Sequence, residues 1–157
     1  MSFAAAFAAI LRYEGVHNVD SGGDTWYGIS RDAHPEIHPW PPSDSQVSLF
    51  YHNEWNDSGA MHVPEPADVP YFLAWINMPS FAIRCLQRAV RANGVAIVDD
   101  GHFGIITLTA LGKVHGETLA AALRSEAAGQ YRIFVLENHA DGIYLNGWLK
   151  RAYEEPL

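Results

Sequence analysis

Apolar residues recur at helical spacing over most of the chain. Phe3, Phe7, Ile10 and Leu11 lie three, four or seven positions apart, so they would share one face of a helix over residues 3–14. Pro79 separates two further helical patterns, and Gly94 follows the second of them as a C-terminal stop. The same periodicity predicts helices over residues 43–55, 69–78, 80–93, 105–114, 117–139 and 146–155. The pattern therefore predicts a mainly α-helical protein.

The segment between the first two helices breaks this pattern. Residues 17–24 are rich in turn formers, and residues 25–29 could form a short extended piece. We expect a small β-hairpin or an irregular loop here, near the N-terminus. Residues 35–42 contain four of the nine prolines, so they cannot form the interior of a helix and are expected to form a surface loop.

Length and charge narrow the class of protein. At 157 residues, with no internal repeat and no linker-like tract, the chain is expected to fold as one unit over residues 1–157. The net charge of −8 argues against nucleic-acid binding, which draws its affinity from Lys and Arg. A single cysteine excludes an internal disulfide. Of the eight histidines, His34 and His38 alone stand four apart, and Pro35 breaks the helix that would align them, so neither a metal nor a cofactor is expected.

Glu14 is the leading candidate for chemistry. It stands in the last turn of the first predicted helix, where the partial negative charge of unpaired carbonyls favours a protonated carboxyl group. Such a group can act as a general acid in glycoside hydrolysis. Asp20 and Thr25 follow on the adjacent loop, where they could orient a water molecule. The alternatives are a solvated helix end for Glu14, a turn residue for Asp20 and a strand or cap hydroxyl for Thr25.

Residues 14–30 form a motif in which Glu-Gly is followed by a polar stretch, Asp, Gly-Gly, Thr and Gly-Ile-Ser. Later segments extend the similarity: Asn77, Ala82 and Leu86-Gln87, then Asp100-Gly101-His102-Phe103-Gly104-Ile105-Ile106-Thr107, then Asn146-Gly147-Trp148-Leu149-Lys150-Arg151. In this order the segments resemble glycoside hydrolase family 108, the N-acetylmuramidases of phages and bacteria. The matched segments span nearly the whole chain.

The resemblance implies a lysozyme-like helical fold that hydrolyses the β-1,4 bond between N-acetylmuramic acid and N-acetylglucosamine. It implies a catalytic lobe over residues 1–75 and a helical, peptidoglycan-binding-like lobe over residues 76–157. It makes Glu14 the catalytic acid. Asp20 and Thr25 resemble the Asp and Thr of phage-type lysozymes, which assist the attacking water. Glycan strands of peptidoglycan would be the partner, and the substrate-binding set would be Trp26, Tyr27, Gly28 and Asn77. Aromatic faces suit sugars, although most aromatic residues fill cores.

Two departures from the family pattern keep other functions open. Val16 stands where the family has a second glycine, and the interval from Glu14 to Thr25 is about three residues shorter than in the family. Asp24 could then replace Asp20 as the second carboxylate. A non-catalytic peptidoglycan-binding module, a degenerate lysozyme homologue and a structural adaptor are the alternatives to an endolysin.

The apolar opening of the chain bears on where the protein acts. Residues 3–11 lack a basic flank and are too short to span a bilayer, so we expect neither a secretory signal nor a transmembrane segment. The protein would be made in the cytoplasm and would act in the periplasm or cell wall after export or lysis. A holin or a secretion apparatus would then be a partner.

Overall fold

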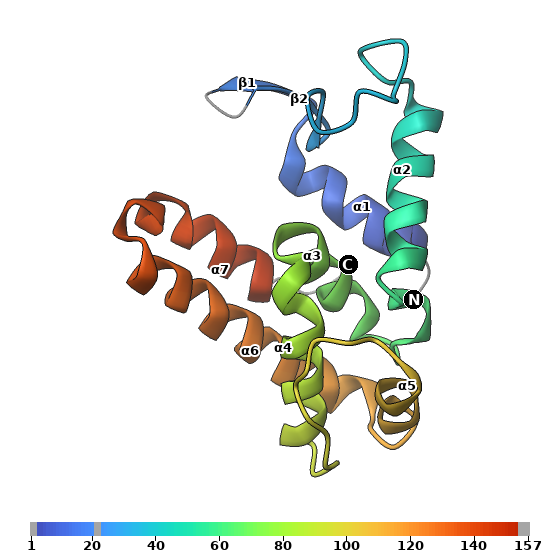
Figure 1. Cartoon of the computed structure of the whole chain (residues 1–157), viewed down its shortest axis with the longest axis vertical. Helices are drawn as coiled ribbons and strands as arrows, with labels where there is room; N and C mark the ends of the chain where they lie inside the picture. The colour runs from blue at the N-terminus through green and yellow to red at the C-terminus, as the bar shows by residue number, and fades with distance from the viewer. Residues whose placement is uncertain (1–2, 21–22, 154–157) are drawn as a thin grey trace.

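The computed structural model describes residues 3–20 and 23–153. It is mainly helical, with a small antiparallel sheet near the N-terminus, which confirms the predicted fold class (Figure 1). In Figure 1 helices α1 and α2 stand with the sheet in the upper part, and α5 and α6 lie in the lower part. Helix α3 lies between them, and α4 extends from there into the lower part, beside α6.

Helix α1 spans Phe3–Glu14, as predicted, and buries Ala6, Ala9 and Ile10. A three-stranded meander follows it: β1 (His17–Asp20), β2 (Gly23–Trp26) and β3 (Ile29–Ser30), in the order β1-β2-β3. The turn between β2 and β3 consists of Tyr27 and Gly28, which both have positive φ values, 49° and 80°. Paired positive φ values match the twist of a two-residue hairpin turn. The expected hairpin is therefore present and carries a third strand.

Helix α2 spans Asp44–Asp57, close to the predicted 43–55. Ser43 caps it, because its hydroxyl accepts from the Gln46 backbone NH while the Gln46 side chain accepts from the Ser43 NH. The proline-rich segment before it forms turns, and a short 3-10 helix, η1 (Ala60–His62), follows it.

The remaining helices are α3 (Asp68–Asn77), α4 (Pro79–Ala92), α5 (Ile105–Leu111), α6 (Gly116–Glu137) and α7 (Leu145–Tyr153), with a 3-10 helix, η2 (His139–Tyr144), before α7. Pro79 takes the first turn of α4, where its missing NH is tolerated. Helix α6 runs without interruption through Gly129. It packs against α4 on one side and against α7 on another.

Buried apolar side chains form one cluster that extends from Ala6 in α1 to Ala152 in α7. Helix α3 lies at its centre and contacts α1, α4, α6 and α7. The expected lobe boundary between residues 75 and 76 falls inside α3, and the division into two lobes stays a prediction. Among the described residues, none of the helices is both long and apolar enough to cross a membrane.

Candidate functional site

The Glu14 carboxylate lies at the end of α1, and its side chain is only 21% exposed. Its Oε1 is 3.2 Å from Nη1 of Arg151, whose side chain is 15% exposed. The carboxylate therefore forms a largely buried ion pair with a residue of the last helix. The sequence does not predict this cation, because the expectation for Glu14 rests on the helix carbonyls alone.

Arg151 connects four helices. Its Nη1 also donates to Oδ1 of Asn77 in α3, and its Cζ lies 5.1 Å from the ring centroid of Tyr13 in α1. Nδ2 of Asn77 donates in turn to the Tyr131 hydroxyl of α6 at 3.0 Å. Burial raises the pKa of this tyrosine. The network brings two expected site residues, Glu14 and Asn77, to the same cation.

Gly28 is the third predicted site residue that lies close to Glu14. A Cβ atom added to Gly28 would lie 2.7 Å from Oε2 of Glu14, so the hairpin turn is in close contact with the carboxylate. The Tyr51 hydroxyl of α2 donates to the Tyr27 carbonyl at 2.6 Å and holds the turn. Burial, and next the charge of Glu14, raise the pKa of Tyr51.

The side chains expected to activate water are held within the sheet region. The Thr25 hydroxyl donates to the Asn18 carbonyl at 3.2 Å. Asp24, the alternative second carboxylate, accepts from Trp40 Nε1 at 2.9 Å and lies 3.0 Å from His17 Nε2. Asp20 ends β1, and its side chain lies outside the described part of the structure. The roles of Asp20 and Thr25 in water activation stay predictions.

The two aromatic residues of the hairpin face different surroundings. The Trp26 ring lies 5.3 Å from the His17 ring, centroid to centroid. Tyr27 lines a pocket of about 270 Å³ with Phe7, Leu11, Asp44 and Val47. Both side chains are half-buried, and their contact with sugar stays a prediction.

A larger open groove of about 450 Å³ lies between α1, η2 and α7. Arg151 is one of its walls and at the same time the partner of Glu14, so the groove reaches the ion pair. Its lining residues are Arg12, Tyr13, Ile143, Tyr144, Gly147, Trp148, Lys150 and Arg151. The sequence does not predict this groove, although the Gly-Trp-x-x-Arg motif at residues 147–151 contributes three of its walls.

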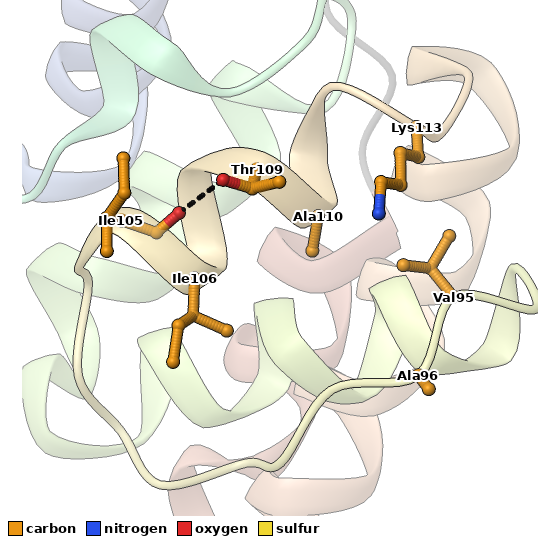
Figure 2. Close-up of a pocket in the computed structure, with 7 residues that line it drawn as sticks. All are labelled: Val95, Ala96, Ile105, Ile106, Thr109, Ala110 and Lys113. Atoms are coloured by element: carbon orange, nitrogen blue, oxygen red, sulfur yellow. Dashed lines mark hydrogen bonds between the residues drawn. The ribbon is translucent and has the colours of Figure 1, made fainter.

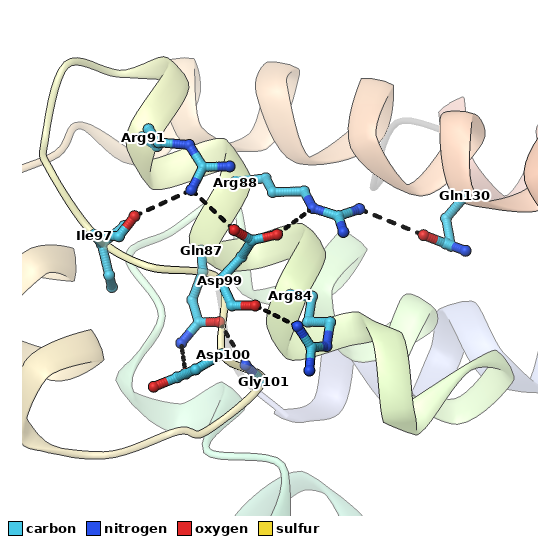
Figure 3. A network of polar contacts seen from close by, with 9 residues as sticks. All are labelled: Arg84, Gln87, Arg88, Arg91, Ile97, Asp99, Asp100, Gly101 and Gln130. Atoms are coloured by element: carbon cyan, nitrogen blue, oxygen red, sulfur yellow. Dashed lines mark hydrogen bonds and ion pairs between the residues drawn. The ribbon is translucent and has the colours of Figure 1, made fainter.

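The second motif, Asp100 to Thr107, forms a loop pinned to α4 by Gln87, which is 1% exposed (Figure 3). Nε2 of Gln87 donates to Asp100 Oδ1 at 2.8 Å and to Thr107 Oγ1 at 3.1 Å. Oε1 of Gln87 accepts from the Gly101 NH at 2.9 Å. Asp100, Gly101 and Thr107 of this motif are thus all held by the one side chain of Gln87.

Asp99 anchors the same loop through two arginines of α4 (Figure 3). Its carboxylate lies 2.7 Å from Arg88 Nε and 3.0 Å from Arg91 Nη1. These hydrogen bonds, with Arg88 first, hold the pKa of Asp99 well below its usual range. The loop is therefore fixed by charge as well as by the amide of Gln87.

An apolar pocket of about 230 Å³ lies between this loop and α5 (Figure 2). Figure 2 shows Ile106 and Val95 on its walls with Lys113 at one end. Ile105 and Ile106 are 76% and 71% exposed. The pocket lacks a carboxylate among its described lining residues, so it does not offer an acid for glycoside hydrolysis.

Within residues 3–20 and 23–153, no three His, Cys, Asp or Glu side chains come together in an arrangement that could hold a metal ion. Cys85 is buried in α4, and burial raises the pKa of its thiol to about 12.

Comparison with known proteins relates the second part of the chain to peptidoglycan. Residues 81–153 match the model of a family described as "Predicted Peptidoglycan domain". The solved structure of Brucella abortus SagA matches with a TM-score of 0.71 at 19% sequence identity, covering 99% of this chain and 98% of that chain. At that identity the likeness concerns the fold alone. The sequence matches none of the curated proteins. Residues 81–153 are therefore similar to a peptidoglycan-related family, and this similarity is coarser than the resemblance to glycoside hydrolase family 108.

Proposed function

We propose that the protein is a peptidoglycan hydrolase that cleaves the β-1,4 bond between N-acetylmuramic acid and N-acetylglucosamine. The observation that carries the proposal is the position of Glu14, a largely buried carboxylate at a helix end whose partner, Arg151, lines an open groove with aromatic walls. The match of residues 81–153 to a peptidoglycan family supports the choice of substrate.

In this proposal Glu14 donates its proton to the glycosidic oxygen as the bond to the muramic acid ring breaks. The acid form of Glu14 has no charge to pair with Arg151, so the guanidinium then keeps Asn77 as its hydrogen-bond acceptor. Asp20 or another carboxylate of the sheet region would orient the attacking water. Gly28 leaves the Glu14 carboxylate room beside the hairpin turn.

Digestion of purified sacculi tests the proposal. The wild type should release new reducing ends that mass analysis identifies as N-acetylmuramic acid, whereas 1,6-anhydro ends would indicate a lytic transglycosylase. Glu14→Gln should abolish the release, because glutamine cannot donate an acidic proton. Glu137→Gln is the matched control, since Glu137 is also the last residue of a helix but is exposed. Unchanged release by Glu14→Gln would refute the assignment of the acid.

A non-catalytic peptidoglycan-binding module is the second candidate. Two observations favour it: the ion pair that holds Glu14 and the hydrogen bond that occupies the Thr25 hydroxyl. This function predicts that the wild type sediments with sacculi and releases no reducing ends. The digestion above therefore separates the two functions, because binding without cleavage fits only the second.

The same proposal includes the place of action. The protein acts in the periplasm or cell wall after export or lysis, with a holin or a secretion apparatus as partner. Fractionation of cells that express the chain with and without a pore-forming protein tests it. The chain should reach the wall fraction only when the pore is present.

A further inference from the structure

Asn77 has both ends of its side-chain amide occupied inside the protein. Its Oδ1 accepts from Nη1 of Arg151, and its Nδ2 donates to the Tyr131 hydroxyl at 3.0 Å. A guanidinium group only donates hydrogen bonds, so Arg151 requires the oxygen of the amide to face it, and the NH2 group then faces Tyr131. The side chain of Asn77 therefore connects α3 to α7 and α6. A hydrogen bond from this amide to a sugar would compete with both contacts.

Tyr131 fixes the orientation of this amide. Its side chain is only 2% exposed, and its ring stacks on that of Trp148 with the centroids 5.3 Å apart. Burial raises the pKa of Tyr131, so its hydroxyl stays neutral and can accept the hydrogen bond from Asn77. A rotation of the amide by half a turn would place its NH2 group against the guanidinium of Arg151, where two donors would meet. Tyr131 therefore keeps the Asn77 oxygen directed at Arg151.

Arg151 shares one nitrogen between Asn77 and Glu14. Its Nη1 lies 3.2 Å from Oε1 of Glu14 and also donates to Oδ1 of Asn77. The side chain of Arg151 is only 15% exposed, so water does not readily replace a lost acceptor. When Glu14 takes up a proton, the ion pair is lost and the Asn77 oxygen remains as an acceptor. Without that oxygen, protonation of Glu14 would leave the guanidinium poorly satisfied.

The other titratable groups that act on Glu14 are two tyrosines, Tyr51 of α2 and Tyr131 of α6. Burial raises the pKa of both, so both hydroxyls stay neutral around pH 7. The hairpin turn presents Gly28, which has no side chain to titrate. A change in how readily Glu14 takes up a proton is therefore expected to come through Arg151, the cation that it contacts.

We infer that Asn77 is a positioning residue, oriented by Tyr131, that satisfies Arg151 when Glu14 is protonated and so lets Glu14 hold the proton of the reaction. The proton comes from solvent, binds the Glu14 carboxylate and passes to the glycosidic oxygen as the glycosidic bond breaks. The role in catalysis rests on the proposed function, because that function makes Glu14 the acid. The inference gives Asn77 a different role from the substrate contact that the family resemblance implies.

Carbon-13 NMR of the Glu14 carboxyl group tests the inference without any need for activity. Glutamate is labelled at its side-chain carboxyl carbon, and the Glu14 signal is the one that is missing in Glu14→Gln. Asn77→Leu should lower the pH midpoint of the Glu14 titration by about one pH unit, because protonation then costs the guanidinium its remaining acceptor. Asn77→Asp should raise the midpoint, because the new carboxylate satisfies Arg151 and repels the charge of Glu14. A residue that only supports the fold would not produce opposite shifts.

Tyr131→Phe keeps the ring and removes the hydroxyl that orients the amide, so it should shift the midpoint in the same direction as Asn77→Leu, by less. Tyr71→Phe is its matched control, since Tyr71 is also buried and its hydroxyl donates to a backbone carbonyl at 2.7 Å. Asn93→Leu is the control for Asn77→Leu, because Asn93 also lies at a helix end and its amide donates to a backbone carbonyl at 2.8 Å. Neither control should move the Glu14 midpoint, and far-UV circular dichroism checks that each variant is folded.

Digestion of sacculi over a range of pH connects the proton to the reaction. In Asn77→Leu the release of reducing ends should fall about tenfold at pH 7 and recover as the pH is lowered, because fewer molecules hold the proton on Glu14 at neutral pH. KM should change by less than about two-fold. A contact between Asn77 and sugar predicts instead a higher KM and an unchanged pH profile.

Equal midpoints in the wild type and Asn77→Leu would overturn the inference, even if the protein cleaves sacculi. A shift in Asn77→Asp alone would not rescue it, because a new charge near any carboxylate produces one. A raised KM with an unchanged pH profile in Asn77→Leu would also overturn it and would favour the substrate contact. Opposite shifts in a protein that releases no reducing ends would support the positioning of Arg151 by Asn77, and in that case only the proposed hydrolase fails.

Discussion

At the scale of single residues, Gly28 meets two requirements at once. Its φ of 80° lies in the left-handed region, and the Glu14 carboxylate occupies the space where a side chain would begin. Gly15 also has a positive φ, 63°, but nothing lies within 4 Å of the position that its Cβ would take. The two glycines therefore differ in their contact with Glu14 and share the backbone requirement.

Gly28→Ala should lower the free energy of unfolding by about 2–3 kcal/mol, because backbone strain and a displaced carboxylate add together. Gly15→Ala should lower it by only about 1 kcal/mol, from strain alone. Urea unfolding measures both changes. Release of reducing ends from sacculi should fall in Gly28→Ala and persist in Gly15→Ala. Equal loss of stability in the two variants would contradict the close approach to Glu14.

Arg151 is the second residue with a sharp expectation. Arg151→Gln leaves Glu14 without its cation in a largely buried place, so the free energy of unfolding should fall by about 2–4 kcal/mol. Arg151→Lys keeps the charge but loses the planar guanidinium that contacts Glu14 and Asn77 together. Its free energy of unfolding should therefore lie between those of the wild type and Arg151→Gln. Arg132→Gln removes an exposed arginine as a control. A stability of Arg151→Gln within about 0.5 kcal/mol of the wild type would rule out the network as described.

The sequence predicts Glu14 at a helix end, because helix periodicity and a following glycine are local signals. It does not predict the partner of Glu14, because Arg151 lies at the other end of the chain and long-range pairs leave no periodic trace. The motif resemblance makes Gly28 a substrate-binding residue, and that role stays a prediction. Its close approach to Glu14 follows only when the turn and α1 are placed together.

At the scale of elements, the loop between α4 and α5 is held by side-chain polar contacts in place of regular structure. Gln87 satisfies donors and acceptors of the loop, and Asp99 ties it to two arginines of α4. Such a loop depends on a few side chains, so single substitutions should release it.

Gln87→Leu keeps the volume of the side chain but leaves the Gly101 NH without its acceptor. The free energy of unfolding should fall by about 2–4 kcal/mol, measured by urea. Gln130→Leu offers a comparison, because Gln130 is also buried but its side chain accepts a longer hydrogen bond, 3.4 Å from Arg88. A neutral Gln87→Leu would contradict the loop-pinning role.

The contacts of Asp99 with two arginines predict a specific dependence of folding stability on pH. Hydrogen bonds to Arg88 and Arg91 lower its pKa in the folded state, so the stabilisation is complete above the unfolded value of about 4. It is lost as the pH falls below that value toward the folded pKa. Asp99→Asn should therefore be less stable than the wild type at pH 7, with the difference shrinking below pH 4. Thermal unfolding between pH 7 and pH 2.5 measures this, with the exposed Asp57→Asn as control.

The helices were predictable because each carries its own apolar stripe, and their observed bounds lie within a few residues of the expected ones. Helix α5 ends at Leu111, earlier than the predicted 114, because Gly112 stops it. The strand Ile29–Ser30 and the 3-10 helices η1 and η2 are too short to show a period. Their formation depends on tertiary contacts that a local pattern does not contain.

At the scale of the whole molecule, one apolar cluster joins α1 to α7, so the chain should unfold as a single cooperative unit. Four of the five tryptophans, at positions 26, 40, 55 and 75, precede α4. Tryptophan fluorescence therefore reports mainly on the first part of the chain, while far-UV circular dichroism reports on all helices. The two urea transitions should coincide, and Gln87→Leu should shift both by the same amount. A separate fluorescence transition would indicate two independent lobes.

The contact between Glu14 and Arg151 also sets an order during synthesis. Helix α1 leaves the ribosome before α7, and Arg151 of α7 is the cation that holds the last carboxylate of α1. A nascent chain therefore carries Glu14 without its ion pair until translation has passed α7.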